Sequence, residues 1–141
     1  RMLKVCFHQA IEDEKIKFAV IAARYKNQWI YCRHRERNTF EIPGGHREVG
    51  ETIIETAKRE LYEETGAIDF ELEEITVYSV VNDNIETFGM LFFTEVKELG
   101  VLPDLEIEEI QLFDEMPETL TYPLIQPLLI EKVKQVLKMN G

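Results

Sequence analysis

The alternation of apolar and polar residues predicts a chain made mostly of β-strands, with one helix near the middle and another at the end. Segments rich in β-branched, aliphatic and aromatic residues are typical of strands, and Asn, Asp and Gly between them are typical of turns. We expect turns at 26–28 and 82–84, and strands at 17–24, 29–33, 39–42, 70–81, 86–96 and 107–113.

Helical spacing of apolar residues appears in two places. Residues 52–65 are expected to form a helix that ends at Gly66, since glycine readily adopts the left-handed conformation found after helices. A second helix is expected after Pro123, with Pro127 in its first turn. A mixed sheet flanked by helices, an α/β fold, follows from this order of elements. No repeat or linker divides the chain, so residues 1–141 are expected to form a single domain.

Composition limits the class of protein. Apolar residues make up 45% of the chain, but no segment reaches the ~18 consecutive apolar residues of a membrane span, and the start lacks a secretory-signal pattern. We therefore expect a cytoplasmic protein with no membrane partner, in which Cys6 and Cys32 are free thiols. A net charge of −11 argues against a DNA-binding surface.

The charge is unevenly distributed. Residues 69–118 contain fifteen acids and one base, Lys97. Residues 24–47 contain only Glu36 and Glu41 as acids and six basic residues: Arg24, Lys26, Arg33, Arg35, Arg37 and Arg47. A small anionic ligand could therefore bind to a locally basic segment of an otherwise acidic protein.

Three carboxylates share one sector of the central helix. Glu63 and Glu64 lie within about 60° of Glu60 when each residue advances the chain by about 100°. This sector borders the expected apolar stripe, which contains Ile53, Ile54, Ala57 and Leu61. Clustered carboxylates repel one another unless a cation lies among them, and Mg²⁺ prefers oxygen ligands. The chain contains 22 Glu residues, however, so an acidic, solvated helix face is the simple alternative.

The wider spacing is harder to explain by composition. Seven charged and glycine positions have fixed spacings, and their chance occurrence in a chain of this composition is on the order of one in a hundred thousand. They are Gly45, Glu51, Arg59, Glu60, Glu63, Glu64 and Gly66.

This 23-residue stretch, from Gly45 to Ala67, resembles the signature box of the Nudix hydrolases. Every charged and glycine position of the box is present, and Ala67 is the one departure, at a position that is usually bulky and aliphatic. The resemblance implies an α/β/α sandwich with a mixed β-sheet and a loop–helix–loop catalytic motif. It also implies hydrolysis of a nucleoside diphosphate linked to another moiety, with Mg²⁺, or Mn²⁺, as cofactor.

The resemblance also implies roles for individual residues. Glu60 and Glu64 would be metal ligands, and Glu63 a further ligand or the base that activates water. Gly44 would offer its carbonyl oxygen to a metal ion. Arg59 would orient the glutamates and belongs with Glu60 and Glu63 in the catalytic set. The motif itself would be held together by Gly45, Glu51 and Gly66.

Residues outside the box are less clearly marked. Family members often supply another acid from a later loop, and the candidates are Asp104, Glu106, Glu108 and Glu109. We take Arg47, Arg35 and Glu109 as candidate substrate contacts, with Arg24 and Arg37 as further candidates for binding phosphate. Aromatic residues that could stack on a base are Phe40, Phe88 and Tyr122, although each also suits a hydrophobic core.

The absence of residues typical of particular Nudix enzymes narrows the choice of substrate. Asp83 and Asn84 stand where ADP-ribose and dinucleoside-polyphosphate enzymes tend to have proline and tyrosine, and residues 119–123 lack the asparagine of many 8-oxo-purine enzymes. A nucleoside triphosphate, an oxidised purine included, cleaved to monophosphate and pyrophosphate is our preferred substrate. The alternatives are a non-catalytic nucleotide sensor, an RNA 5′-end pyrophosphohydrolase, and an isopentenyl-type isomerase that would need a catalytic cysteine. Oligomeric state is left open.

Overall fold

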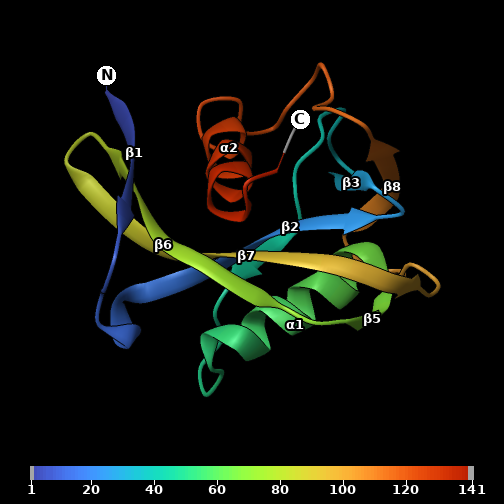
Figure 1. Cartoon of the computed structure of the whole chain (residues 1–141), viewed down its shortest axis with the longest axis horizontal. Coiled ribbons are helices and arrows are strands. Elements are labelled where there is room, and N and C mark those ends of the chain that lie inside the picture. Colours follow the sequence, from blue (N-terminus) through green and yellow to red (C-terminus); the bar gives the residue numbers. More distant parts are fainter. Residues whose placement is uncertain (1, 140–141) are drawn as a thin grey trace.

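A single mixed sheet forms the centre of the protein in the computed structural model, which describes residues 2–139 (Figure 1). Eight strands take part, in the order β1-β6-β7-β2-β3-β8, with β4 paired to β2 and β5 paired to β7. The strands are β1 (Leu3–His8), β2 (Ile16–Tyr25), β3 (Gln28–His34), β4 (Gly44–His46), β5 (Ala67–Phe70), β6 (Glu73–Asn82), β7 (Ile85–Leu99) and β8 (Ile107–Phe113). A short 3₁₀ turn, η1 (Asp13–Lys15), precedes β2. Strands β2 and β7 are parallel and their neighbours are antiparallel, so the sheet is mixed as expected.

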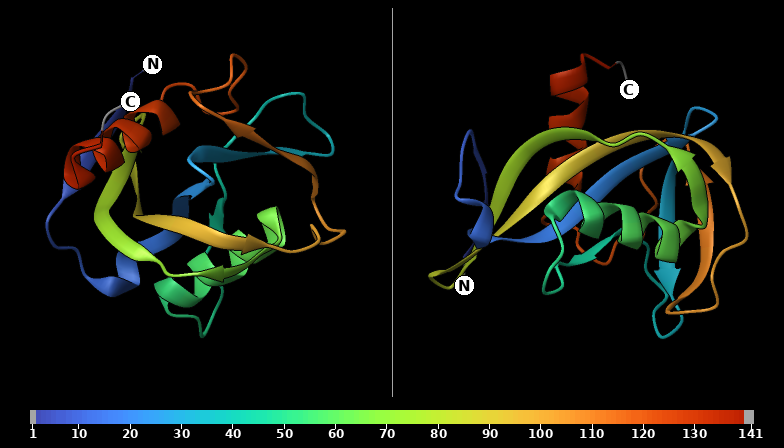
Figure 2. Two further views of the ribbon diagram at one scale, coloured as in Figure 1. Left: turned by 45° about the vertical axis from the view of Figure 1, so that its right-hand side comes forward. Right: turned by 90° about the horizontal axis from the view of Figure 1, so that it is seen from below.

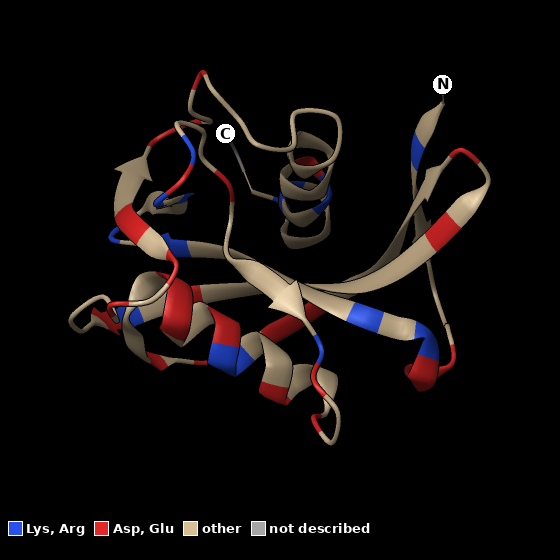
Figure 3. Cartoon of the chain, turned by 180° about the vertical axis from the view of Figure 1, so that it is seen from behind, with Lys and Arg blue, Asp and Glu red and all other residues tan. Residues whose placement is uncertain are grey.

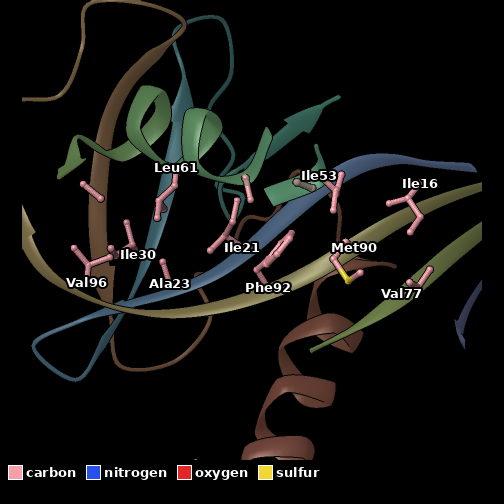
Figure 4. Close-up of a cluster of buried hydrophobic side chains, with 13 residues drawn as sticks. Ile16, Ile21, Ala23, Ile30, Ile53, Leu61, Val77, Met90, Phe92 and Val96 are labelled. Carbon is pink, nitrogen blue, oxygen red and sulfur yellow. The ribbon is translucent and has the colours of Figure 1, made fainter. Parts of the chain in front are cut away.

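The two helices, α1 (Ile53–Thr65) and α2 (Gln126–Leu137), lie on opposite faces of the sheet (Figures 1 and 2). Because successive strand residues point to opposite faces, Ile21 of β2 packs on the α1 side and Ala22 on the α2 side. Leu61 and Phe92 are fully buried in the α1 layer (Figure 4), and burial of such side chains contributes about 2 kcal/mol each. The α/β/α sandwich is thereby confirmed.

Helix α1 has well-defined ends. Its N-cap Thr52 accepts a hydrogen bond from the Glu55 backbone, and the Glu55 side chain accepts one from the Thr52 backbone, which forms a capping box. Gly66 follows the last turn with φ of 80°, in the left-handed region expected for a terminating glycine. Ala67 is buried and begins β5, opposite Leu99, so a small aliphatic residue fills this box position without disturbing the strand.

Several sequence expectations need correction. Strand β1 was not predicted, and the expected strand 70–81 is two strands with a break between Phe70 and Glu73. Residues 39–42, expected as a strand, make only isolated bridges, to Cys32 and Leu120, while Gly44–His46, for which no strand was expected, is strand β4. Ile54 is 40% exposed and leaves the apolar stripe of α1.

Other features agree with the expectations. Cys6 and Cys32 are both free thiols, and Pro127 lies in the first turn of α2. Within residues 2–139, no helix has the length and apolar character needed to cross a membrane.

Gly66→Ala is expected to destabilise the protein more than Gly50→Ala. Both glycines have positive φ (80° and 86°), so alanine at either position costs about 1 kcal/mol in backbone strain. A Cβ at Gly66 would also lie 2.9 Å from the carbonyl oxygens of Gly100 and Val101, whereas a Cβ at Gly50 meets nothing within 4 Å. Urea unfolding should show a loss at least about 1 kcal/mol larger for Gly66→Ala. Equal losses would contradict the close approach.

Candidate active site

A cavity of about 520 Å³ lies where α2, the adjoining face of the sheet and the segment 41–46 meet. Its lining divides by chemistry. Acidic residues gather along α1 and the neighbouring loops (Figure 3), and five of them line the cavity: Glu41, Glu48, Glu60, Glu64 and Glu106. The apolar lining comes from the sheet and α2, and includes Phe18, Val20, Tyr78, Val80, Ile125 and Leu129.

Glu64 is the most buried of the predicted site carboxylates, with 6% of its surface exposed. Its Oε1 accepts a hydrogen bond from the Gly44 N–H at 2.9 Å. Burial raises the pKa of Glu64 to about 8 despite that hydrogen bond, and the neighbouring carboxylates, Glu60 first, raise it further. The carboxylate form of Glu64 therefore lacks a compensating charge.

Glu60 lies one helical turn before Glu64 and approaches the backbone of Gly45. A Cβ on residue 45 would lie only 2.2 Å from Glu60 Oε2, so only glycine leaves room for this carboxylate. Burial also raises the pKa of Glu60, although Arg59 donates a hydrogen bond to it. Glu60 and Glu64 thus face one cavity as a pair of carboxylates that both resist ionisation.

Arg59 connects the loop before α1 to the glutamates. Its Nε and Nη2 donate to the two carboxylate oxygens of Glu51 at 2.6 and 3.0 Å, and Nη2 also donates to the His46 carbonyl. The hydrogen bond from Arg59 is the main reason that the pKa of Glu51 falls to about 2. Arg59 Nη1 extends to Glu60 at 3.0 Å and Glu63 at 3.4 Å. The structure therefore brings these box residues into one network.

Two acids outside the box also line the cavity. Glu41 is buried, and it contacts Arg37 at 3.0 Å and His34 at 3.6 Å. Glu106, one of the four acids considered for the later loop, also lines a second cavity of about 230 Å³, shared with Glu63 and Glu64. His34 and Glu41 were not among the predicted site residues; the only signal for Glu41 in the sequence is an acid between apolar residues just before Pro43.

The three predicted substrate contacts lie elsewhere. The Arg47 guanidinium donates to the carbonyls of Asp13, Ile16 and Glu51, and pairs with the Asp13 carboxylate. Arg35 donates to the Leu105 carbonyl and pairs with Asp104 and Glu108. Glu109 accepts hydrogen bonds from Gln111 and Arg33, which keep its pKa below the usual range. None of these three residues lines the cavity, whereas Arg37 does.

The candidate aromatic residues also separate. Phe40 packs edge-on against Phe113 in the core under α2, and Phe88 packs against His8 and the core under α1. Tyr122 is 40% exposed and lines the cavity. His46 also lines it, with its ring 4.4 Å from that of Phe18.

The donor chemistry of the acidic wall suits a hard divalent cation. Five carboxylates line one cavity, and among residues 2–139 the buried Glu64 has no basic side chain within 4 Å other than His34, at 3.9 Å. Among residues 2–139 no three acidic, His or Cys side chains already converge on one point, so side-chain rotation would complete the set of ligands.

Comparisons with known proteins agree with this geometry. The NUDIX domain family model matches residues 11–127. A Bacillus subtilis (strain 168) protein named "Putative 8-oxo-dGTP diphosphatase YtkD" is 31% identical over 106 residues, which cover 74% of this chain and 66% of that protein. The chain thus matches slightly less than two thirds of the length of this relative.

Solved structures show the same fold. The Bacillus subtilis pyrophosphohydrolase BsRppH has a TM-score of 0.78 at 24% identity, covering 94% of this chain and 90% of that one. A UDP-X diphosphatase has a TM-score of 0.73 at 21% identity, covering 87% of this chain and 63% of that one. With a complete signature box and most of its length matched by the family model, the chain belongs to the Nudix hydrolase family.

Proposed function

We propose that this protein is a pyrophosphohydrolase that requires a divalent metal and cleaves a nucleoside triphosphate to a monophosphate and pyrophosphate. The observation on which the proposal rests is that five acids, Glu41, Glu48, Glu60, Glu64 and Glu106, line one cavity whose remaining lining is largely apolar. An acidic wall repels a bare triphosphate but suits its complex with Mg²⁺ or Mn²⁺.

The residues that would hold the metal are Glu60 and Glu64, with Glu63, the Gly44 carbonyl, Glu41 and Glu106 within the same lining or next to it. A bound divalent cation neutralises phosphoryl oxygens, acidifies the attacking water and aligns the leaving group. The Glu63 side chain is 35% exposed and borders the smaller cavity. This position suits it to accept a proton from a water molecule or to serve as a further metal ligand. Arg59 acts by holding Glu51, Glu60 and Glu63 in place.

The apolar wall supports a nucleoside at the other end of the substrate. Phe18 and Tyr122 offer aromatic surface, and Val20 and Leu129 offer aliphatic surface to a base. The name of the Bacillus subtilis relative includes 8-oxo-dGTP, which supports an oxidised purine nucleotide among the substrates.

The alternatives have less support. An RNA substrate needs a basic track for its backbone, but the expected basic segment is paired internally: Arg33 with Glu109, Arg35 with Asp104 and Glu108, and Arg47 with Asp13. An isomerase would need a reactive thiol, yet Cys32 is fully buried, its thiol donates to the Glu41 carbonyl, and burial raises its pKa. A non-catalytic sensor has no need to retain Glu60, Glu63 and Glu64 together.

Turnover of a nucleotide panel with Mg²⁺ or Mn²⁺ tests the proposal, with products separated by chromatography. Pyrophosphate and a monophosphate should form and should disappear when EDTA removes the metal. Glu60→Gln should lower kcat/KM by at least about 100-fold, because it removes a ligand charge while its side-chain oxygen still accepts the Arg59 hydrogen bond. Glu74→Gln, an exposed acid on β6, is the matched control and should retain activity. Binding without turnover would favour a sensor, and hydrolysis of 5′-triphosphate RNA alone would favour RNA processing.

Glu106 and Glu109 give a second test, because only Glu106 lines the cavity. Glu106→Gln should lower kcat/KM by at least about tenfold and raise the metal concentration needed for half-maximal rate. Glu109→Gln removes a charge of the same kind from a neighbouring position and should leave kcat/KM within about twofold. The reverse result would show that Glu109 rotates into the site when substrate binds.

The stability of the metal-free protein tests the charge on the acidic wall. Glu64 has a pKa of about 8 in the folded protein against 4.5 as its reference value. Between these two values the folded state keeps a proton that the unfolded chain loses, so raising the pH from 5 to 8.5 should destabilise the fold, by at most about 4 kcal/mol. Glu64→Gln keeps an oxygen for the Gly44 N–H and removes the charge.

In EDTA, Glu64→Gln should match the wild type in thermal unfolding at pH 5 and be more stable at pH 8.5. Mg²⁺ should then raise the melting temperature of the wild type more than that of the variant. An identical pH profile for the two proteins would rule out Glu64 as the source of the effect.

A further inference from the structure

Gln126, the first residue of α2, is a polar side chain in the part of the cavity wall where α2 meets the segment 41–46. Only 6% of its surface is exposed. Its Oε1 accepts a hydrogen bond from the Ile42 backbone N–H at 2.9 Å. This hydrogen bond joins α2 to the segment that also contains Glu41 and Gly44.

The hydrogen bond fixes which end of the amide faces the cavity. A backbone N–H can only donate, so the group opposite Ile42 must be the oxygen of the Gln126 amide and not its nitrogen. The Nε2 group, with two N–H donors, therefore points away from Ile42. Within residues 2–139 the Nε2 group has no hydrogen-bond partner. It is not fully buried either, so it is accessible to solvent. It remains open to the cavity that Gln126 lines.

The surroundings of Gln126 are those of a base and not of a phosphate chain. Ile125, the N-cap of α2, and Leu129, within α2, line the cavity beside it, and so does Ile42. In the proposed function, the phosphates of a substrate lie at the acidic wall with the metal. An N–H donor in apolar surroundings discriminates strongly among ligands. A ligand acceptor forms a hydrogen bond with it, whereas a ligand donor at the same place leaves both donors without a partner.

We infer that the Gln126 Nε2 group selects nucleotides whose base has a carbonyl at purine position 6 or pyrimidine position 4. Guanine, hypoxanthine, uracil and thymine have an acceptor oxygen there, whereas adenine and cytosine have an amino group. This inference rests on the proposed function and adds to it the substrate class: keto-base nucleotides are preferred to amino-base nucleotides.

Uncharged nucleosides test the inference independently of hydrolysis and of metal. Two matched pairs differ at the relevant position: inosine with adenosine, and uridine with cytidine. Titration of ¹⁵N-labelled protein should show the Gln126 side-chain amide signals, assigned by their loss in Gln126→Glu, shifting with inosine and uridine. The dissociation constants should be at least about fivefold lower for inosine and uridine than for their partners.

Gln126→Glu provides the decisive variant. Its carboxylate still offers an oxygen to the Ile42 N–H and replaces the cavity-facing N–H groups with an acceptor, so the preference for carbonyl bases should be lost or reversed. The Ile42 backbone signal reports whether the variant retains the native contact. Thr87→Val, which removes another polar group from the cavity lining, is the matched control and should leave the preference unchanged.

Turnover of inosine, adenosine, uridine and cytidine triphosphates completes the test. A carbonyl preference in nucleoside binding with no hydrolysis of any triphosphate would overturn the proposed function and leave the role of Gln126 standing. Hydrolysis without a carbonyl preference, or a preference that Gln126→Glu does not change, would overturn the inference and leave the pyrophosphohydrolase standing.

Discussion

The bidentate contact between Arg59 and Glu51 is the interaction on which the site depends. It connects α1 to the loop before the helix, and the same guanidinium extends to Glu60 and Glu63. One cation therefore sets both the path of the loop and the direction of two carboxylates. The Arg59 side chain is only 23% exposed, and charge-assisted hydrogen bonds of this kind hold their geometry better than exposed ion pairs do.

The acidic wall sets function against folding stability. Folding by itself disfavours a buried carboxylate such as Glu64 beside Glu60, since burial and mutual repulsion both oppose ionisation. The backbone makes the arrangement tolerable: the Gly44 N–H donates to Glu64, and Gly45 has no side chain to keep Glu60 away. A metal site needs this uncompensated negative charge. The unfavourable burial of carboxylates is therefore found at the place where the chemistry is proposed.

The cavity joins the two faces of the fold. Helix α1 supplies Glu60 and Glu64, α2 supplies Gln126 and Leu129, and the segment 41–46 runs between them. The hydrogen bonds from Gly44 to Glu64 and from Ile42 to Gln126 connect this one segment to both helices. A substrate bound with its phosphates at the acidic wall would thus have its base beside α2.

The sequence by itself determined the features that are local. The signature box lies within 23 residues, and strands β2, β3 and β7 contain long runs of apolar residues. Both the box and these strands could therefore be predicted. The edge strand β1 was missed because it is short and only partly buried, and its pairing with β6 is made by residues far along the chain. Only the tertiary structure decided which of the later acids lines the cavity. A register shift between β3 and β8 places Glu109 opposite Arg33 and Ile107 opposite His34, leaving Glu106 at the cavity. Which acid lines the cavity could not be predicted from the sequence, because strand register depends on the packing of the whole sheet.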